Sequence, residues 1–271
     1  MKINKNNFLE NGFIKFENLI SKNLIKKIKV NSLKLIQNQT DTDLKKQIST
    51  GSMINVSKKE AEIFVDLIEY KKILKGINQL GFNDIRWSSG YIISKPPKSP
   101  PLYWHNDWWA WNDPISYETK PSMIFVMVYL EKTTIKNGCL RVIPKSHIEY
   151  NETHKIIKKH HSKYRLYKNS NDPVYKKAKN EINIFSKPGD VIIGDARILH
   201  AAHSNNSKLN RNLITLWFYP DYQKLPSRIK ASAKHKWPND WSKKSKDKLN
   251  KIFPNYSGKA KKIKWERLRK H

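Results

Sequence analysis

One short segment of the chain carries two residues that commonly bind metal ions. His105 and Asp107 lie in the run Tyr103-Trp104-His105-Asn106-Asp107. In an extended strand, residues two apart point to the same face, so this imidazole and this carboxylate can reach one ion. Many histidines stand two residues from an aspartate, and a solvated strand edge is the alternative for the pair taken alone.

A second histidine further along the chain completes a possible ligand set. His200 follows the turn signal Pro188-Gly189 and the apolar run 191–194, which together predict a strand ending near this histidine. Two histidines and one carboxylate form the facial triad of non-haem Fe(II) sites, which leaves positions open for a chelating 2-oxo acid and O₂. His203 is a competing ligand three residues further on.

Arg211 is a candidate anchor for such a 2-oxo acid. It follows a turn at Asn205, Asn206 and Ser207 and would begin a returning strand. A planar guanidinium holds a carboxylate through two parallel hydrogen bonds, which an ammonium cannot match. Solvation at the surface is the alternative for an arginine at a strand start.

Four tryptophans crowd the metal motif: Trp104, Trp108, Trp109 and Trp111. Such a cluster can stack on a ring or enclose an alkylated ammonium group. Packing in the core is the alternative. If the strand continues past Asp107, Trp109 and Trp111 share the face of the metal ligands.

The elements that position these residues change along the chain. Before about residue 85 we predict helices: Ser21 caps one, and Ser57 and Glu60 form a capping box before a second that ends at Gly81. Short strands separated by proline and glycine turns follow, at 86–94, 123–130, 140–143, 182–185, 190–194 and 213–219. The polar stretch 145–180 is predicted to be a long excursion near the site. Such a series of strands predicts a mainly β barrel or sandwich, including the jelly-roll and cupin forms.

Composition limits the class of protein. The chain has 271 residues, of which 38% are hydrophobic, enough for a core, and we expect a single domain over 1–271. No apolar stretch is long enough to span a membrane, and the N-terminus lacks the apolar segment of a secretory signal. One cysteine, Cys139, cannot form an internal disulfide and is expected to be a packed thiol. We therefore expect a cytoplasmic protein of undetermined oligomeric state.

The formal net charge of +30 raises the question of anionic partners. Lysine outnumbers arginine, asparagine and isoleucine are abundant, and no nucleic-acid-binding module is evident, which favours compositional bias with a preference for small anions. Residues 221–271 carry 17 Lys and Arg against 4 Asp and Glu. They also hold aromatic residues, including Trp237, Trp241 and Trp265, so we predict that this segment packs near the site mouth.

These motifs in their order resemble the phytanoyl-CoA dioxygenase family over residues 8–220. The resemblance rests on His105-Asn106-Asp107, the run 137–147 (NGCLRVIPKSH) and the spaced set Gly189-Asp190, His200, Asn205, Ser207 and Arg211. It implies a double-stranded β-helix, the cupin-like form of a jelly roll, with N-terminal helices. It also implies an Fe(II)- and 2-oxoglutarate-dependent oxygenase.

The resemblance also implies roles for individual residues. His105, Asp107 and His200 would hold Fe(II), Arg211 would bind 2-oxoglutarate, and Trp111 would form an aromatic wall beside it. His203 as the ligand would leave the arginine out of register with the family. The family often has a serine two residues after the third ligand, where this chain has Ala202.

The implied reaction is hydroxylation of a small organic substrate, with release of succinate and CO₂, and the abundance of Lys and Arg favours an anionic one. Halogenases of the family replace the ligand carboxylate with a small residue, and Asp107 is present here. Two alternatives remain open: a nucleic-acid-modifying oxygenase, which would use the positive charge for phosphate contacts, and a non-enzymatic cupin-like binding protein.

Overall fold

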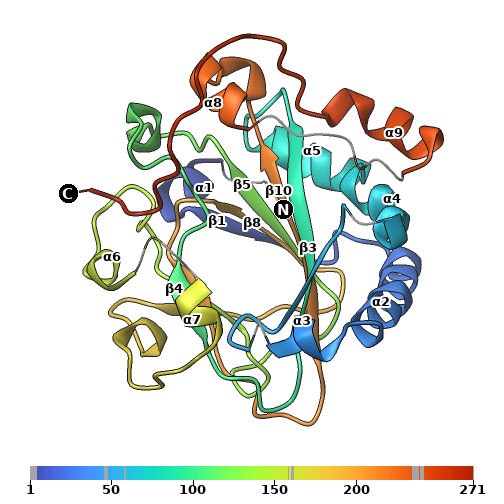
Figure 1. Cartoon of the computed structure of the whole chain (residues 1–271), viewed down its shortest axis with the longest axis vertical. Coiled ribbons are helices and arrows are strands. Elements are labelled where there is room, and N and C mark those ends of the chain that lie inside the picture. The colour runs from blue at the N-terminus through green and yellow to red at the C-terminus, as the bar shows by residue number, and fades with distance from the viewer. Residues whose placement is uncertain are drawn as a thin grey trace.

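The computed structural model describes residues 5–45, 48–57, 59–157, 159, 162–233, 238 and 241–270. Within them the chain forms two antiparallel sheets that enclose a cavity, with helices outside the larger sheet (Figure 1). The larger sheet has the order β1 (Phe13–Phe16), β8 (Val191–Asp195), β5 (Ile124–Tyr129), β10 (Arg211–Tyr219), β3 (Arg86–Lys95) and β2 (Ser52–Asn55). The smaller has the order β4 (Leu102–His105), β9 (His200–Ala202), β6 (Leu140–Val142) and β7 (Ile182–Ile184). This arrangement confirms the predicted double-stranded β-helix.

The N-terminal helices cover the outer face of the larger sheet. They are α1 (Lys5–Asn11), α2 (Lys22–Gln37), α3 (Asp41–Lys45), η1 (Lys59–Phe64), α4 (Val65–Ile68) and α5 (Lys71–Gln79). Ile28 of α2, Leu67 of α4 and Ile77 of α5 belong to one buried cluster with side chains of β5 and β10. The predicted N-terminal helices are therefore present and support the sheet from outside.

Strand β10 shows how the sheet separates the core from the cavity. Ile214, Leu216 and Phe218 point to the helices and are fully buried in that cluster. The alternate residues Arg211, Leu213, Thr215, Trp217 and Tyr219 line the cavity. Successive side chains of a strand point to opposite faces, so one strand contributes both to the core and to the site.

The two helix predictions have different outcomes. Ser21 does cap α2, since its side chain accepts a hydrogen bond from the N–H of Leu24 at 3.3 Å. The capping box at Ser57 and Glu60 is wrong, because the chain there forms the short 3-10 helix η1 and the N–H of Ser57 donates to the side chain of Asn55. Gly81 ends the helical region as predicted, with a φ of 88°.

All six predicted strands are present, with ends that differ by a few residues. The prediction omits β1, β2 and β9, which have three or four residues each. The placement of Trp109 and Trp111 on the face of the metal ligands depends on the strand running past Asp107, and this condition is not met. Strand β4 ends at His105, and the N–H groups of Asp107 and Trp108 both donate to the carbonyl of Ala196 at 2.8 Å.

The remaining elements connect the strands or follow the last one. They are η2 (Pro114–Tyr117), α6 (Thr153–Ile156), α7 (Ser162–Arg165), η3 (Pro173–Tyr175), η4 (Tyr222–Lys224), α8 (Ser227–Ser232), α9 (Lys243–Leu249) and η5 (Asn250–Ile252). The excursion 145–180 therefore contains short helical turns. Helix α9 packs against α4. After η5, the C-terminal stretch passes α8 and ends on the side of the molecule where α6 lies (Figure 1). Trp237 lies outside the described residues. No described helix is long and apolar enough to cross a membrane.

Candidate metal and co-substrate site

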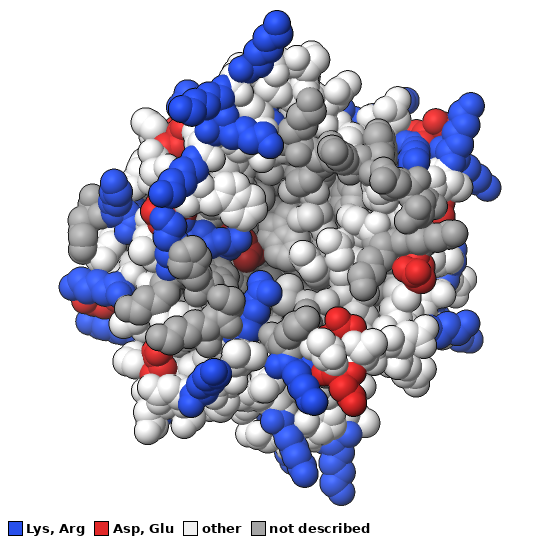
Figure 2. Space-filling model, viewed as in Figure 1, with Lys and Arg blue, Asp and Glu red and all other residues white. Residues whose placement is uncertain are grey.

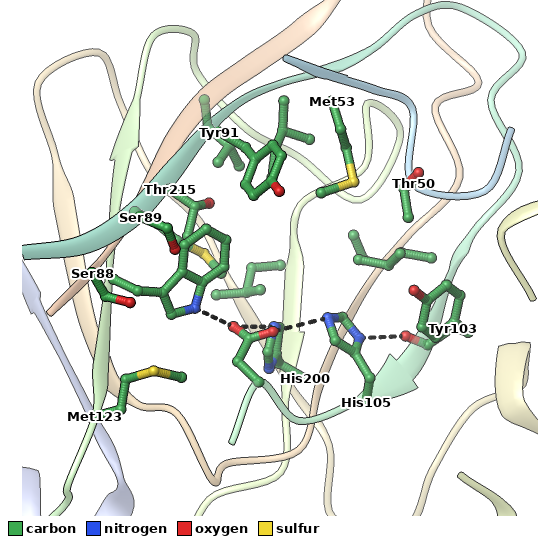
Figure 3. Close-up of a pocket in the computed structure, with 18 of the residues that line it drawn as sticks. Thr50, Met53, Ser88, Ser89, Tyr91, Tyr103, His105, Met123, His200 and Thr215 are labelled. Carbon is green, nitrogen blue, oxygen red and sulfur yellow. Dashed lines mark hydrogen bonds and ion pairs between the residues drawn. The ribbon is translucent and has the colours of Figure 1, made fainter. Parts of the chain in front are cut away.

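The structure brings His105, Asp107 and His200 together at one end of the cavity. His105 ends β4 and pairs in register with His200, which begins β9, so strand pairing sets the two imidazoles side by side (Figure 3). Nε2 of each histidine lies 3.7 Å from a different oxygen of Asp107. The three ligand atoms all lie within 4.8 Å of one another, so they could hold a single metal ion.

Hydrogen bonds to backbone carbonyls orient both imidazoles. Nδ1 of His105 donates to the carbonyl of Tyr103 at 2.9 Å, and Nδ1 of His200 donates to that of Ile198 at 3.1 Å. A carbonyl accepts only from a protonated nitrogen, so the neutral tautomer that fits each bond has the lone pair on Nε2, facing the shared space. Burial, followed by the nearby His200, lowers the pKa of His105 to about 3, which keeps this imidazole neutral at physiological pH.

Asp107 is held from the opposite sheet. Nε1 of Trp217, on β10, donates to Oδ2 of Asp107 at 2.9 Å. A fixed carboxylate with two imidazoles is a donor set that suits Fe(II) and leaves other coordination positions open. The residues present therefore fit the metal that the sequence predicts.

His203 lies outside this ligand group. Its Nε2 lies 2.7 Å from the side-chain oxygen of Asn183, so the imidazole has a different partner. His203 also does not line the cavity, whereas His200 does. The structure thus favours His200 over His203 as the third ligand.

A pair of buried cations lines another part of the same cavity, where β10 begins and β3 ends. Arg211 and Lys95 are direct partners in the register of these strands, and each is less than 5% exposed. Nζ of Lys95 donates to the carbonyls of Ser49 and Pro100, and Nε of Arg211 has no partner among the described groups. Burial lowers the pKa of both residues, and the charge of Arg211 lowers that of Lys95 further.

This arrangement suits the distal carboxylate of 2-oxoglutarate. Two adjacent buried cations repel each other and have lost water, and a carboxylate between them would relieve both effects. Ala202, which also lines the cavity, cannot supply the serine hydroxyl that the family often has. Lys95 supplies a donor near Arg211 in its place.

Trp111 does not lie where the resemblance places it. Its indole is 1% exposed, donates to Oδ1 of Asn106 at 3.0 Å and does not line the cavity. Because β4 ends at His105, strand alternation no longer applies beyond it, and Trp109 lines the cavity instead. Trp109 and Trp217 are thus among the aromatic side chains that line the cavity, and Trp217 contacts the ligand Asp107.

The C-terminal segment reaches the site, as predicted for its described residues. Glu266 pairs with the backbone of Trp109 and Trp111, and Trp265 and Arg267 line the cavity. Arg165, at the end of α7, lines it as well.

Sequence reasoning omitted several of these residues. Lys95 could have been found, because alternation along β3 places it on the same face as Tyr91 and Ile93, which also line the cavity. Trp217 lies on the face of Arg211 for the same reason. Arg267 could not have been found from the sequence, because nothing there shows that the C-terminal segment returns to the metal ligands.

The cavity has a volume of about 420 Å³, which accommodates small molecules. It is walled by apolar side chains, including Met53, Met127 and Leu213, with a few polar groups between them. Figure 2 shows the molecule hollowed at the centre of the same view.

Comparison with known proteins agrees with this site. The family model described as phytanoyl-CoA dioxygenase (PhyH) matches residues 8–213. A protein of Stutzerimonas stutzeri named probable alpha-ketoglutarate-dependent hypophosphite dioxygenase is 22% identical over 224 residues, 78% of this chain and 76% of that protein. A phytanoyl-CoA dioxygenase domain-containing protein 1 homolog of Dictyostelium discoideum is 28% identical over 171 residues, 60% of this chain and 52% of its own length.

Solved structures share the fold. The non-heme alpha-ketoglutarate-dependent epimerase SnoN from nogalamycin biosynthesis superposes with a TM-score of 0.60 at 14% identity, covering 80% of this chain and 82% of the other. EctD from S. alaskensis, crystallised with 2-oxoglutarate and 5-hydroxyectoine, superposes with a TM-score of 0.58 at 18% identity, covering 79% and 74%. The two-sheet barrel with outer helices is thus an architecture that 2-oxoglutarate-dependent enzymes use.

Proposed function

This chain belongs to the phytanoyl-CoA dioxygenase family of Fe(II)- and 2-oxoglutarate-dependent oxygenases, and from that premise we propose that it hydroxylates a small organic substrate. The observation that carries this proposal is Asp107, a carboxylate that faces both imidazoles and is fixed by Trp217. A carboxylate ligand occupies the position that a halide needs in halogenation, and therefore favours hydroxylation. An oxygenase is an enzyme, so the non-enzymatic alternative falls away.

We propose that His105, Asp107 and His200 hold the iron, and that Arg211 with Lys95 holds the distal carboxylate of 2-oxoglutarate. When bound, iron and 2-oxoglutarate supply the oxidation of a C–H bond by O₂, with release of succinate and CO₂. The chain contributes position and environment. Its two buried cations orient the co-substrate, its carbonyls at Tyr103 and Ile198 orient the imidazoles, and its apolar walls exclude water.

A nucleic-acid substrate is the second candidate, and only the net charge of +30 favours it. On the face seen in Figure 2, Lys and Arg side chains are spread around the periphery with acidic side chains among them. A cavity of about 420 Å³ suits a small molecule better than a polymer, apart from a single flipped base.

Succinate formation tests the assignment. Purified protein with Fe(II), 2-oxoglutarate and O₂ should form succinate slowly alone and faster with its substrate, screened from small-molecule and single-stranded nucleic-acid pools. His200→Ala should abolish succinate formation and iron binding, and His203→Ala, the matched control, should keep both. Undiminished activity in His200→Ala with loss in His203→Ala would overturn the ligand assignment.

The product tests the reaction type. With isotopically labelled O₂, a hydroxylated product carries one labelled oxygen atom. A coupled product that is epimerised, cyclised or desaturated, with no oxygen inserted, would refute hydroxylation while leaving the oxygenase assignment intact.

A further inference from the structure

The C-terminal residues 261–270 form a strap across the mouth of the cavity. The N–H of Glu266 donates to the carbonyl of Trp109 at 2.8 Å, and the N–H of Trp111 donates to the carbonyl of Glu266 at 3.0 Å. The side chain of Asn106 donates to the carbonyl of Arg267 at 3.1 Å. Three hydrogen bonds thus attach the strap to the segment that carries Asp107, so its position is coupled to that of a metal ligand.

The strap brings two side chains to the cavity. Trp265 stacks on Trp109 at 5.5 Å between ring centroids with an interplanar angle of 22°. Arg267 lies with its guanidinium 5.6 Å from the ring centroid of Trp265 and is partly buried. Burial lowers the pKa of Arg267, and the charge of Asp107 acts in the opposite direction, so this guanidinium lies within electrostatic reach of the ligand group.

A second arginine reaches the same region from α7. Arg165 lines the cavity together with Tyr103, the residue whose carbonyl orients His105. Nε of Arg165 is buried and has no partner among the described groups. Arg165 and Arg267 line the same cavity, and the positive charge of Arg165 contributes to lowering the pKa of Arg267.

Most other buried or half-buried arginines are differently placed. Arg141 pairs with Glu181, Arg197 with Asp195, and both pairs are buried. Among the described residues, neither Arg165 nor Arg267 has an ion pair with a carboxylate, and Asp107 is the sole acidic residue that lines the cavity. Asp107 is a proposed metal ligand, and two guanidinium groups that line one cavity without an ion pair of their own suit an anion that comes from outside the chain.

We propose that Arg165 and Arg267 bind an anionic group of the substrate, a carboxylate or an oxyanion of phosphorus, at the mouth of the cavity. This inference rests on the proposed function and names its substrate class. The cavity then has two cationic sites: Lys95 with Arg211 for the co-substrate, and Arg165 with Arg267 for the substrate. The strap makes the second site dependent on the C-terminal residues, since Arg267 is held there by Asn106 and Glu266.

Binding to the complex with Fe(II) and 2-oxoglutarate, without O₂, tests the proposal. The probes are butanoate, methylphosphonate and inorganic phosphate, with neutral butanamide as the control, measured by calorimetry and by the absorption of the iron–2-oxoglutarate complex. At least one anion should bind, and butanamide should not. The ranking of the anions distinguishes a carboxylate from a phosphorus oxyanion as the natural group.

Substitutions locate the site. Arg267→Gln and Arg165→Gln should each weaken anion binding roughly tenfold to a hundredfold, because each removes a charged hydrogen-bond donor. Lys264→Gln removes the same charge from an exposed position on the same strap and should leave binding unchanged. Arg267→Lys should restore part of the affinity. All four variants should bind 2-oxoglutarate as the wild type does.

Three results would overturn the proposal: no anion binds, butanamide binds as well as butanoate, or Arg267→Gln and Arg165→Gln bind anions as tightly as Lys264→Gln. Succinate formation without substrate is the separate readout of the proposed function. Its presence alongside any of those results would reject the anion site alone, and its absence in the wild type would reject the function.

Discussion

Replacing Arg211 by methionine should stabilise the ligand-free protein and remove its affinity for 2-oxoglutarate. The side chain is 4% exposed, its Nε has no partner among the described groups, and Lys95 stands directly opposite on β3. Both cations are therefore desolvated and repel each other until an anion arrives. Exchange of a buried charge for an apolar side chain of similar volume commonly stabilises a protein by ~1–4 kcal/mol.

The loss of affinity can be estimated in the same way. Removing one member of a buried charge pair costs ~3–5 kcal/mol, which is roughly a hundredfold to several thousandfold in the dissociation constant of 2-oxoglutarate. Arg211→Lys should recover only part of this, because an ammonium lacks the planar pair of donors. Wild-type protein should gain ~3 kcal/mol of stability from 2-oxoglutarate at a hundred times its dissociation constant, and Arg211→Met should gain almost none.

Arg141 provides the matched control, since it is also a buried arginine on a strand of the barrel. It is 3% exposed, but Glu181 pairs with it at 2.5 Å and the carbonyl of Lys176 accepts from it at 2.8 Å. Arg141→Met leaves that carboxylate buried without its cationic partner and should destabilise by ~3–5 kcal/mol while 2-oxoglutarate still binds. Urea unfolding with and without 2-oxoglutarate, together with calorimetry, measures all of these quantities. An Arg211→Met protein that is less stable than wild type without ligand, or that binds 2-oxoglutarate normally, would refute the reasoning.

Three further predictions concern other parts of the structure. Trp217→Phe removes the indole N–H that fixes Asp107 and should weaken Fe(II) binding roughly tenfold to a hundredfold, whereas Trp109→Phe, another indole of the cavity, should leave metal affinity unchanged in an anaerobic titration. Burial lowers the pKa of His154 from 6.5 to about 4, so the folded state binds fewer protons between these values and stability should fall by up to ~3 kcal/mol as the pH drops through this window. Urea unfolding of His154→Asn should lack that part of the pH dependence. Lys95 stands directly opposite Arg211 as a second cation, so Lys95→Met should bind 2-oxoglutarate more weakly than the wild type in the same calorimetry.

Much of the barrel and of the metal site could be predicted from the sequence because local spacing controls them. Strand β10 alternates between core and cavity, so its period of two places Arg211 once the strand is recognised. His105 and His200 meet through strand pairing, which the order of the motifs implies. Asp107 lies beside His105 as predicted, but strand alternation is not the reason. The chain leaves β4 after His105, and hydrogen bonds to the carbonyl of Ala196 hold the bend that directs the carboxylate toward the imidazoles.

The parts that could not be predicted depend on contacts between distant segments. Trp109 and Trp111 are the same residue type and lie two positions apart, yet only Trp109 lines the cavity. The difference arises because β4 ends at His105, so strand alternation does not place both side chains on one face. Arg267 reaches the metal ligands because Glu266 pairs with backbone far away in the chain. A basic C-terminal segment with tryptophans predicts that the segment packs on the protein. Which of its cations enters the cavity depends on the backbone pairing of Glu266 with Trp109 and Trp111.

The position of each charge matters more here than the net charge of +30. Exposed lysines are screened by salt beyond about 10 Å and by water at all distances, so they act mainly on the rate at which anions arrive. Inside a cavity of low dielectric constant the same unit charge acts several times more strongly. Among the residues that the structure describes, the charged side chains that line the cavity are Lys95, Arg165, Arg211, Arg267 and the ligand Asp107. These side chains and a divalent metal ion together give the cavity a large excess of positive charge. The two negative charges of 2-oxoglutarate neutralise only part of it. The excess that remains lies at the mouth, on the strap and α7, and it is this excess that selects for a substrate carrying its own negative charge.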